Sequence, residues 1–254
     1  MMQILLSPAK RMDFHRADNE ITPVKPLFPK KRDELMDACR TLSVEEIARL
    51  MKLNPVMALE VKGQFQTFGT RNNPTRAAAL AYNGIAYLGL KALDFTADEF
   101  AFAQQHLNIL SGLYGVLRPM DGIHPYRLEM QQMIVPEGYR SLYHFWEESV
   151  NSHLSRRLRK GSPTLINAAS NEYSKVVQKQ LLPARTRIIN LKFLEQEEKG
   201  VRQVVVHTKK ARGMVARFII KNRLTNPEDL KAFDSEGYFF HPSLSKEDEW
   251  VYTR

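Results

Sequence analysis

Cysteine is almost absent from this chain of 254 residues, which contains only Cys39. A single cysteine can form no internal disulfide and no thiolate metal cluster, and it fits the reducing conditions of a cytoplasm. The seven histidines are scattered, with no pair at the spacing of metal ligands. We therefore predict no bound metal and no cofactor.

Long apolar runs are also missing. No stretch approaches the roughly 20 apolar residues that span a bilayer. The first apolar run, residues 1–6, is too short for a signal peptide and has no basic residues before it. The chain lacks a P-loop, a G-x-G-x-x-G fingerprint and an H-E-x-x-H motif. We expect a soluble cytoplasmic protein without membrane contact, and nothing in the sequence identifies a protein partner.

Acidic residues are scarce in one part of the chain. The net charge is +9, yet residues 1–149 carry 17 basic and 17 acidic residues. Residues 156–223, which we call the basic block, carry 17 basic residues against 4 acidic ones, whereas residues 224–254 carry 3 against 7. One concentrated block of this kind is typical of a surface that holds a polyanion, above all duplex nucleic acid. A solvated basic surface is the alternative.

The hydrophobic pattern predicts both strands and helices. Strands are expected at 2–6, 164–168, 187–195, 201–206, 237–240 and 249–252. Helices are expected at 31–41, 44–52, 55–67, 96–110, 141–160, 171–180, 209–222 and 227–232. Without repeats, linkers or a clear boundary, we expect residues 1–254 to form one compact α/β (α+β) unit, a mixed sheet surrounded by helices.

The basic helix expected around 207–223 is the strongest local feature. Its apolar stripe consists of Ala211, Val215, Phe218 and Ile219. Its other faces carry Lys209, Lys210, Arg212, Gly213 and Arg217. Small residues between the cations let a phosphate approach, and two lysines at a positive helix N-terminus favour a bound anion. The alternative is a surface helix whose basic side chains extend into solvent.

A pair of glycines, Gly112 and Gly115, follows the helix expected at 96–110. A tight glycine turn between two helices presents backbone N–H groups to a phosphate. Helix-hairpin-helix modules hold duplex backbones in this way without reading their sequence. The alternative is a turn with a purely structural role.

Polar side chains also lie beside the ends of predicted strands, where α/β proteins gather ligand-binding groups. These residues are Lys10, Arg127, Glu129, Asn167, Ser170, Glu172 and Tyr173. We expect all of these except Tyr173 to converge with Lys209 and Arg212 on one concave site. Lysine and arginine would clamp a phosphate there, while Glu129 and Glu172 would orient it or act as a base. The alternative is a buried ion-pair network.

These segments resemble the YaaA family of peroxide-stress proteins. The matching segments are 5–10, 102–107, 110–119, 125–130, 167–173, 209–213, 217–220 and 235–240. One departure is Arg11, where the family more often has a small hydroxyl residue. The resemblance implies a compact α/β fold with a helix-hairpin-helix-like element and a positively charged cleft. It also implies duplex DNA binding and a role in limiting peroxide damage, associated with lower free iron; because the sequence offers no iron ligand set, that effect would be indirect.

Three functions are compatible with these observations. The first, which we favour, is a DNA-binding protein that contacts mainly the phosphate backbone and protects DNA from iron-driven oxidation. Its phosphate contacts would come from Lys10, Gly112, Gly115, Arg127, Asn167, Ser170, Tyr173, Lys209, Lys210, Arg212, Gly213 and Arg217. The second is a nucleic-acid-processing enzyme for base excision or backbone cleavage, with Lys10, Glu129 and Glu172 as nucleophile or acid/base groups. The third is an enzyme for a small phosphorylated metabolite.

Overall fold

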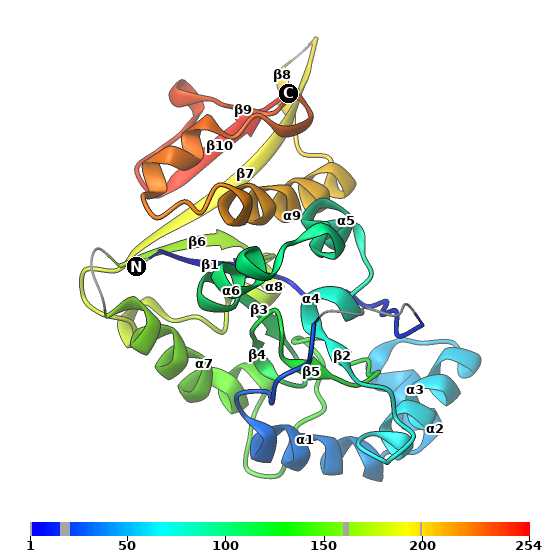
Figure 1. The fold of residues 1–254 in the computed structure, drawn as a ribbon. Helices are drawn as coiled ribbons and strands as arrows, with labels where there is room; N and C mark the ends of the chain where they lie inside the picture. Colours follow the sequence, from blue (N-terminus) through cyan, green and yellow to red (C-terminus); the bar gives the residue numbers. More distant parts are fainter. Residues whose placement is uncertain (1, 16–20, 160–162, 199) are drawn as a thin grey trace.

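The computed structural model describes residues 2–15, 21–159, 163–198 and 200–254 (Figure 1). The strands are β1 (Met2–Leu6), β2 (Arg76–Ala77), β3 (Leu107–Ser111), β4 (Gly115–Leu117), β5 (Gly122–Ile123), β6 (Thr164–Ala168), β7 (Arg187–Glu197), β8 (Gly200–Arg202), β9 (Phe239–Phe240) and β10 (Glu249–Thr253). The α-helices are α1 (Pro29–Thr41), α2 (Val44–Met51), α3 (Pro55–Thr67), α4 (Ala78–Ala81), α5 (Ile85–Leu90), α6 (Ala97–His106), α7 (Leu142–Leu158), α8 (Asn171–Ser174) and α9 (Val205–Lys221). Short 3-10 helices are η1 (Ala92–Asp94), η2 (Lys179–Leu181), η3 (Pro227–Ala232), η4 (Ser235–Gly237) and η5 (Pro242–Leu244).

The main sheet is mixed, as the sequence predicted. Within the described residues its strand order is β4-β3-β1-β6-β7-β10-β9, with β8 paired to β7. The strands β3, β1, β6, β7 and β10 run parallel, whereas β4, β8 and β9 are antiparallel to their neighbours. All five residues of β1 are buried, Gln3 included, and four of them are apolar, as expected for a central parallel strand against which helices pack.

The order of the central strands creates a crevice between β1 and β6. The chain leaves β1 toward β3 on one side and leaves β6 toward β7 on the other. Where neighbouring parallel strands connect in opposite directions, the loops at their carboxyl ends diverge and leave room for a ligand. Leu6 pairs with Ala168, so these two ends lie side by side, and the backbone N–H of Ser170 donates to Ser7 Oγ at 2.8 Å.

Helix α9 packs closely on α5 beside this crevice (Figure 1). The contact is made by glycines: a Cβ on Gly213 would lie 1.7 Å from the carbonyl oxygen of Ala86. A Cβ on Gly89 would lie 2.2 Å from the carbonyl oxygen of Lys210. Residues with side chains would push the helices apart, so glycine at both positions allows the backbones to touch.

The helix expected at 96–110 ends at His106, and the chain continues as β3. Gly112 and Gly115 therefore form the turn of a β-hairpin between β3 and β4, and the prediction of a helix pair at this turn is wrong. The run Leu-Asn-Ile-Leu is apolar enough for either element, and pairing with β1 decides the outcome. The turn is buried: a Cβ on Gly112 would lie 2.3 Å from the Leu128 carbonyl oxygen, and Gly115 has a φ of 71°.

Two helices joined by a tight turn do occur, in α2 and α3. A capping box of Ser43 and Glu46 starts α2, and Asn54 caps α3 ahead of Pro55. Between them Lys52 adopts the left-handed conformation, with a φ of 53°. The sequence predicted each helix, but not that the two form a hairpin.

Helix α9 begins at Val205, one turn earlier than expected, so the strand expected at 201–206 ends at Arg202. Lys209 thus lies in the second turn of the helix, and the prediction that it occupies the N-terminus is wrong. Thr208 explains the early start, because its backbone N–H donates to the Val204 carbonyl and its hydroxyl to the Phe193 carbonyl. Tertiary contacts outweigh the strand preference of the valines.

The remaining elements differ from the prediction at their ends. The expected helix at 171–180 consists of α8 and η2, and β9 starts at Phe239. Helix α7 ends at Leu158, while residue 160, the expected end, lies outside the described residues. No helix in the described ranges is long and apolar enough to cross a membrane.

Candidate functional site

A cavity of about 950 Å³ lies at the carboxyl ends of β1 and β6, where the strand order opens a crevice. We call it the switch-point cavity. Its walls come from the loop after β1, the segment 83–86 leading into α5, the loop and helix after β6, and the first half of α9. The predicted site residues that line it are Lys10, Glu129, Ser170, Glu172, Tyr173, Lys209 and Arg212. The structure thus brings together residues that span 200 positions of the sequence.

Glu129 holds two cations at one side of this cavity. Its Oε1 lies 3.0 Å from Lys10 Nζ and 3.4 Å from Arg127 Nε, and Gln132 donates to its Oε2 at 3.2 Å. The Glu129 side chain is 6% exposed, whereas that of Lys10 is 63% exposed. Burial alone would raise the pKa of Glu129, but Lys10 and Arg127 hold it below its usual value. Glu129 is therefore an ionised carboxylate that positions the two cations.

Glu172 has the opposite electrostatic character. Burial raises its pKa, and the charge of Glu129 adds to this effect, although backbone amides and Lys10 oppose it. Its Oε1 is buried with no hydrogen-bond partner among the described residues. The Tyr143 hydroxyl donates to its backbone carbonyl at 2.8 Å and fixes the main chain. Two neighbouring carboxyls with opposite pKa shifts are what acid–base chemistry requires.

Lys209 and Arg212 bring positive charge to the same cavity from α9. Burial lowers the pKa of Arg212. Its Nε is buried without a hydrogen-bond partner, and in the described part of the chain neither cation forms an ion pair. A guanidinium left in this state is costly unless an anion or water reaches it.

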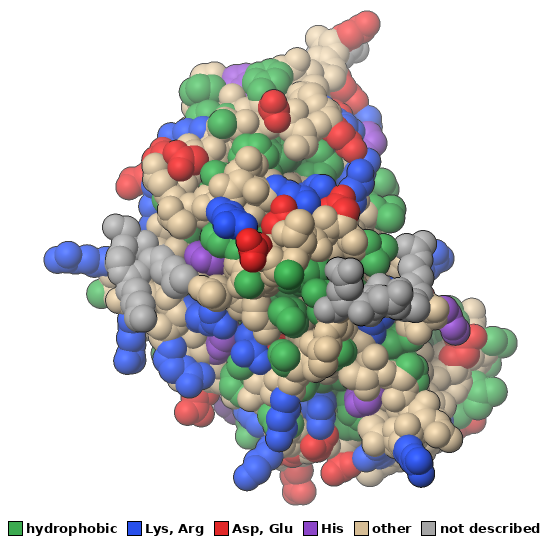
Figure 2. All heavy atoms as spheres, viewed as in Figure 1, with side chains coloured by type: hydrophobic (Ala, Val, Ile, Leu, Met, Phe, Trp, Pro, Cys, Tyr) green, Lys and Arg blue, Asp and Glu red, His purple; other side chains and the backbone are tan. Residues whose placement is uncertain are grey.

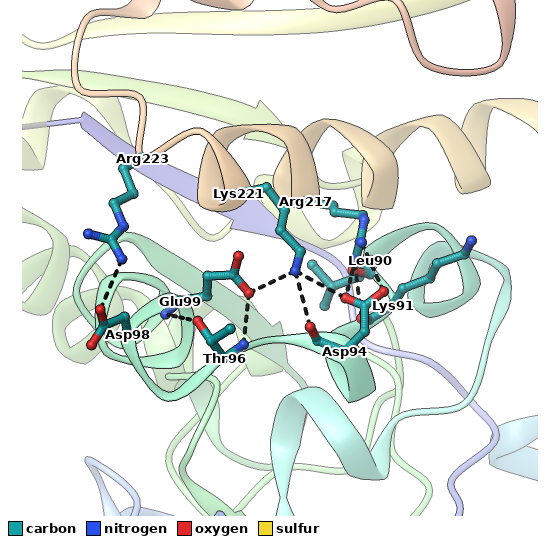
Figure 3. A network of polar contacts seen from close by, with 9 residues as sticks. All are labelled: Leu90, Lys91, Asp94, Thr96, Asp98, Glu99, Arg217, Lys221 and Arg223. Carbon is teal, nitrogen blue, oxygen red and sulfur yellow. Dashed lines mark hydrogen bonds and ion pairs between the residues drawn. The ribbon is translucent and has the colours of Figure 1, made fainter.

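The other cations of α9 are neutralised by acidic side chains. Lys210 pairs with Glu236 outside the cavity. Figure 3 shows Arg217 and Lys221 pointing toward Asp94, with Arg217 Nη1 2.5 Å from Asp94 Oδ1. The structure therefore places Lys210 and Arg217 in ion pairs outside the switch-point cavity, apart from the other predicted phosphate-binding residues.

Four more predicted residues, three glycines and one asparagine, have structural rather than cavity-lining positions. Gly213 packs against α5, and the buried hairpin turn holds Gly112 and Gly115. Asn167 Nδ2 donates to Asn190 Oδ1 at 2.8 Å, and its Oδ1 accepts from the Ala169 N–H at 3.1 Å, which shapes the end of β6. None of these four residues is among those that line the switch-point cavity.

Ion pairs within the molecule also neutralise much of the basic block. Arg187 lies 3.0 Å from Glu228 and 3.2 Å from Asp248, both from the acidic C-terminal segment. Lys192 pairs with Glu249 at 2.8 Å, because β10 runs beside β7. Basic and acidic side chains are accordingly intermixed on the face shown in Figure 2. Two cations of the block, residues 160 and 199, lie outside the described residues.

Buried tyrosines beside the cavity were missed by sequence reasoning. The hydroxyls of Tyr82 and Tyr126 lie 2.6 Å apart, and Tyr126 also contacts Ser111 Oγ at 2.7 Å. The Tyr87 hydroxyl donates to the Ser7 carbonyl at 3.1 Å. Burial raises the pKa of Tyr126 to about 12, so its hydroxyl stays neutral. The contact of Tyr87 holds the loop after β1, and the contacts of Tyr126 join it to Tyr82 and to the end of β3.

The described residues contain no group of three or more His, Cys, Asp or Glu side chains placed to hold a metal ion. The cavity itself presents cations, carboxyls and amides. These can bind an anion at Lys209, Arg212 and Lys10, and they can hold or release a proton at Glu172.

Known proteins match the chain along its whole length. The family described as peroxide stress protein YaaA matches residues 2–244. A UPF0246 protein of Maricaulis maris is 39% identical over 254 residues, covering 100% of this chain and 96% of that protein. A UPF0246 protein of Teredinibacter turnerae is 40% identical over 257 residues, covering 100% and 99%. The resemblance inferred from the sequence segments is confirmed.

Proposed function

The chain belongs to the YaaA family of peroxide stress proteins, with a role in peroxide stress, and on that premise we propose that it binds DNA through the switch-point cavity. In this proposal the protein holds the phosphate backbone and shields DNA from iron-driven oxidation. Contacts to phosphate carry no base information, so binding would be independent of sequence.

One observation carries the proposal: Lys209 and Arg212 line the cavity without an acidic partner among the described residues, while neighbouring cations of α9 are paired. Lys209 is exposed, whereas Arg212 has a buried Nε, and a cation buried without a counter-charge costs stability that a phosphate oxygen would offset. Lys10 reaches the same cavity with an exposed side chain, which gives a third contact for a phosphate chain.

The test is the affinity of the Lys209→Ala and Arg212→Ala variants for a duplex, measured by fluorescence anisotropy. A hydrogen bond to a charged group contributes about 1.5–3 kcal/mol, so each variant should lose roughly tenfold or more in affinity. Arg202→Ala is the matched control, because it removes an exposed cation that pairs with Glu197 far from the cavity lining. Equal affinities for all three variants would rule out DNA binding by this cavity.

A nucleic-acid-processing enzyme is the second candidate, favoured by the opposite pKa shifts of Glu129 and Glu172. Such a pair could serve base excision or backbone cleavage. Lys10, however, is held in an ion pair with Glu129, an arrangement that suits a phosphate-binding ammonium better than a free amine nucleophile.

Borohydride treatment of the protein with an abasic duplex separates the two candidates. We expect no covalent product, no strand cleavage, and weaker binding by Lys10→Ala. A trapped complex that disappears in Lys10→Ala, with binding retained, would identify the protein as an enzyme and Lys10 as its nucleophile.

A further inference from the structure

The switch-point cavity is far larger than a phosphate group requires. Its volume of about 950 Å³ lies at the upper end of the ~300–1,000 Å³ typical of small-molecule sites. A backbone phosphate at Lys209 and Arg212 would occupy only a small part of it. The remaining space must suit whatever is attached to the phosphate.

The cavity has a cationic part and an acidic part. Arg212 and Lys209 form the first, and Glu172 with Glu129 forms the second. The two parts come from different elements: Arg212 and Lys209 belong to α9, whereas Glu172 belongs to α8, and Glu129 pairs with Lys10 at 3.0 Å. Each part contains a buried atom without a hydrogen-bond partner in the described residues, Nε of Arg212 and Oε1 of Glu172. A ligand that satisfies both must be an anion at one end and a hydrogen-bonding group at the other.

The acidic part suits the edge of a nucleobase. A carboxyl accepts from the amino group of a base, and an amide side chain pairs with donor and acceptor atoms together. Glu172 and Asn171 provide these groups side by side in the lining. Apolar side chains complete the cavity, and one of them, Leu88, is 59% exposed at its edge. An apolar surface of this kind suits the face of a base.

We propose that the switch-point cavity binds a single unpaired nucleotide, with its phosphate at Lys209 and Arg212 and its base edge at Glu172 and Asn171. This inference rests on the proposed function for the same site and adds the unit that enters it. The Watson–Crick edge of a paired base is occupied by its partner base, and a base that reaches the cavity must leave the stack. The nucleotide therefore comes from a strand end or an unpaired position, or is a free mononucleotide.

Calorimetric titration tests the inference with 2′-deoxynucleoside monophosphates, the matching deoxynucleosides and inorganic phosphate. We expect each monophosphate to bind at least tenfold more tightly than either fragment, because only it reaches both parts of the cavity. Arg212→Ala should weaken monophosphate binding roughly 10- to 100-fold and leave nucleoside binding unchanged. Inorganic phosphate binding as tightly as a monophosphate would overturn the inference.

Glu172→Gln is the second variant, and it keeps the shape of the side chain. It should change the relative affinities for the four monophosphates while leaving phosphate binding as in the wild type. Unchanged base preference would overturn the assignment of Glu172 to the base edge. Arg202→Ala again serves as control, with wild-type affinity for every ligand.

Duplexes distinguish the source of the nucleotide and separate the inference from the proposed function. A duplex with one unpaired nucleotide should bind more tightly than a fully paired duplex of the same length. Monophosphates that bind while no duplex does would leave the inference standing, with a free nucleotide as ligand, and would end the DNA proposal. If no monophosphate binds but a duplex does, and Arg212→Ala abolishes that duplex binding, the DNA proposal would stand and the nucleotide inference would be overturned.

Discussion

At the scale of single residues, three of the seven buried side-chain atoms that lack a hydrogen bond in the described residues lie at or beside the candidate site. Nearly all buried polar groups in native proteins are hydrogen-bonded, so each exception requires an explanation. In the described residues, the buried side-chain atoms that lack a hydrogen bond include Nε of Arg127, Oε1 of Glu172 and Nε of Arg212. Two of these residues line the switch-point cavity and the third lies beside it. Leaving these polar atoms without hydrogen bonds costs stability, and a ligand in the cavity that completed the hydrogen bonds would remove that cost.

The cost of burying the Glu172 carboxyl can be tested through the pH dependence of protein stability. Because the pKa of Glu172 is raised, folding favours its protonated form, and its contribution is lost as pH rises through the folded pKa. Glu172→Gln should therefore raise the melting temperature by a few degrees at pH 8 and leave it nearly unchanged at pH 4. Thermal unfolding followed by circular dichroism at both pH values measures the effect.

Glu129→Gln is the matched control for that experiment. The pKa of Glu129 is lowered, so its contribution to stability is present above the unfolded pKa and disappears as the pH falls. This variant should be destabilised at pH 8, with a smaller effect at pH 4. A lower melting temperature for Glu172→Gln at pH 8 would contradict the electrostatic account of the pair.

Cys39 is the residue whose reactivity bears on peroxide. It is fully buried in α1, and burial raises the pKa of its thiol to about 12. Peroxide attacks the thiolate, so the folded protein should show no oxidation of Cys39. Peptide mass spectrometry after peroxide treatment, which separates Cys39 from the ten methionines, should find oxidation of this residue only when the protein is first unfolded. Sulfenic acid formation in the folded state would make Cys39 a sensor.

At the scale of elements, the crossing of α5 and α9 positions the cations of the site. Gly213→Ala would place a methyl group 1.7 Å from the Ala86 carbonyl oxygen, and the helices would have to separate. We expect a loss of about 1–3 kcal/mol in the free energy of unfolding, the usual cost of overpacking. DNA affinity should fall as well, because Lys209 and Arg212 lie on the same helix. Urea unfolding and anisotropy measure the two effects.

Gly63→Ala in α3 is the control for this substitution, since a Cβ there would meet no atom within 4 Å. Alanine in a helix interior is favoured over glycine, so this variant should gain about 0.5–1 kcal/mol. If both variants unfold at the same denaturant concentration, close packing of α5 on α9 is not what holds α9 in place.

The sequence predicts a helix or strand correctly where local sequence signals determine its type and its start. The capping boxes at Ser43 and Thr96 mark true helix starts, and the apolar run of β1 is a buried strand. Local signals failed where pairing with distant segments decides: β3 was mistaken for the end of a helix, and the start of α9 for a strand. Both errors concern short apolar runs that either element can contain.

Candidate site residues were predictable for a related reason. Lys10 and Glu172 follow strands whose carboxyl ends meet, so topology brings them together. The pairing of Arg217 with Asp94 was not predictable, because more than 120 residues separate the two and no pattern links them. Lys210 and Glu236 are only 26 residues apart, but again no sequence pattern links them. Sequence identified the cations of α9, but only their partners show which of them are free to bind a ligand.

For the molecule as a whole, charge is distributed differently in space than along the chain. The acidic segment 224–254 folds against the basic block, with Glu228 and Asp248 on Arg187. The acids around α6 neutralise the end of α9 in the same way (Figure 3). The net charge of +9 still attracts a polyanion from a distance. Close contact, however, should involve few cations.

The salt dependence of DNA affinity tests this view of the whole molecule. The slope of log K against log salt is about −0.9 for each phosphate neutralised. If Lys10, Lys209 and Arg212 make the contacts, the slope between 50 and 200 mM salt should be roughly −3, by that rule. The Lys209→Ala/Arg212→Ala double variant should flatten it by about 2, whereas Arg202→Ala should leave it unchanged. A flat wild-type response would exclude phosphate contacts, and a slope much steeper than expected would mean that the paired cations exchange their acidic partners for DNA.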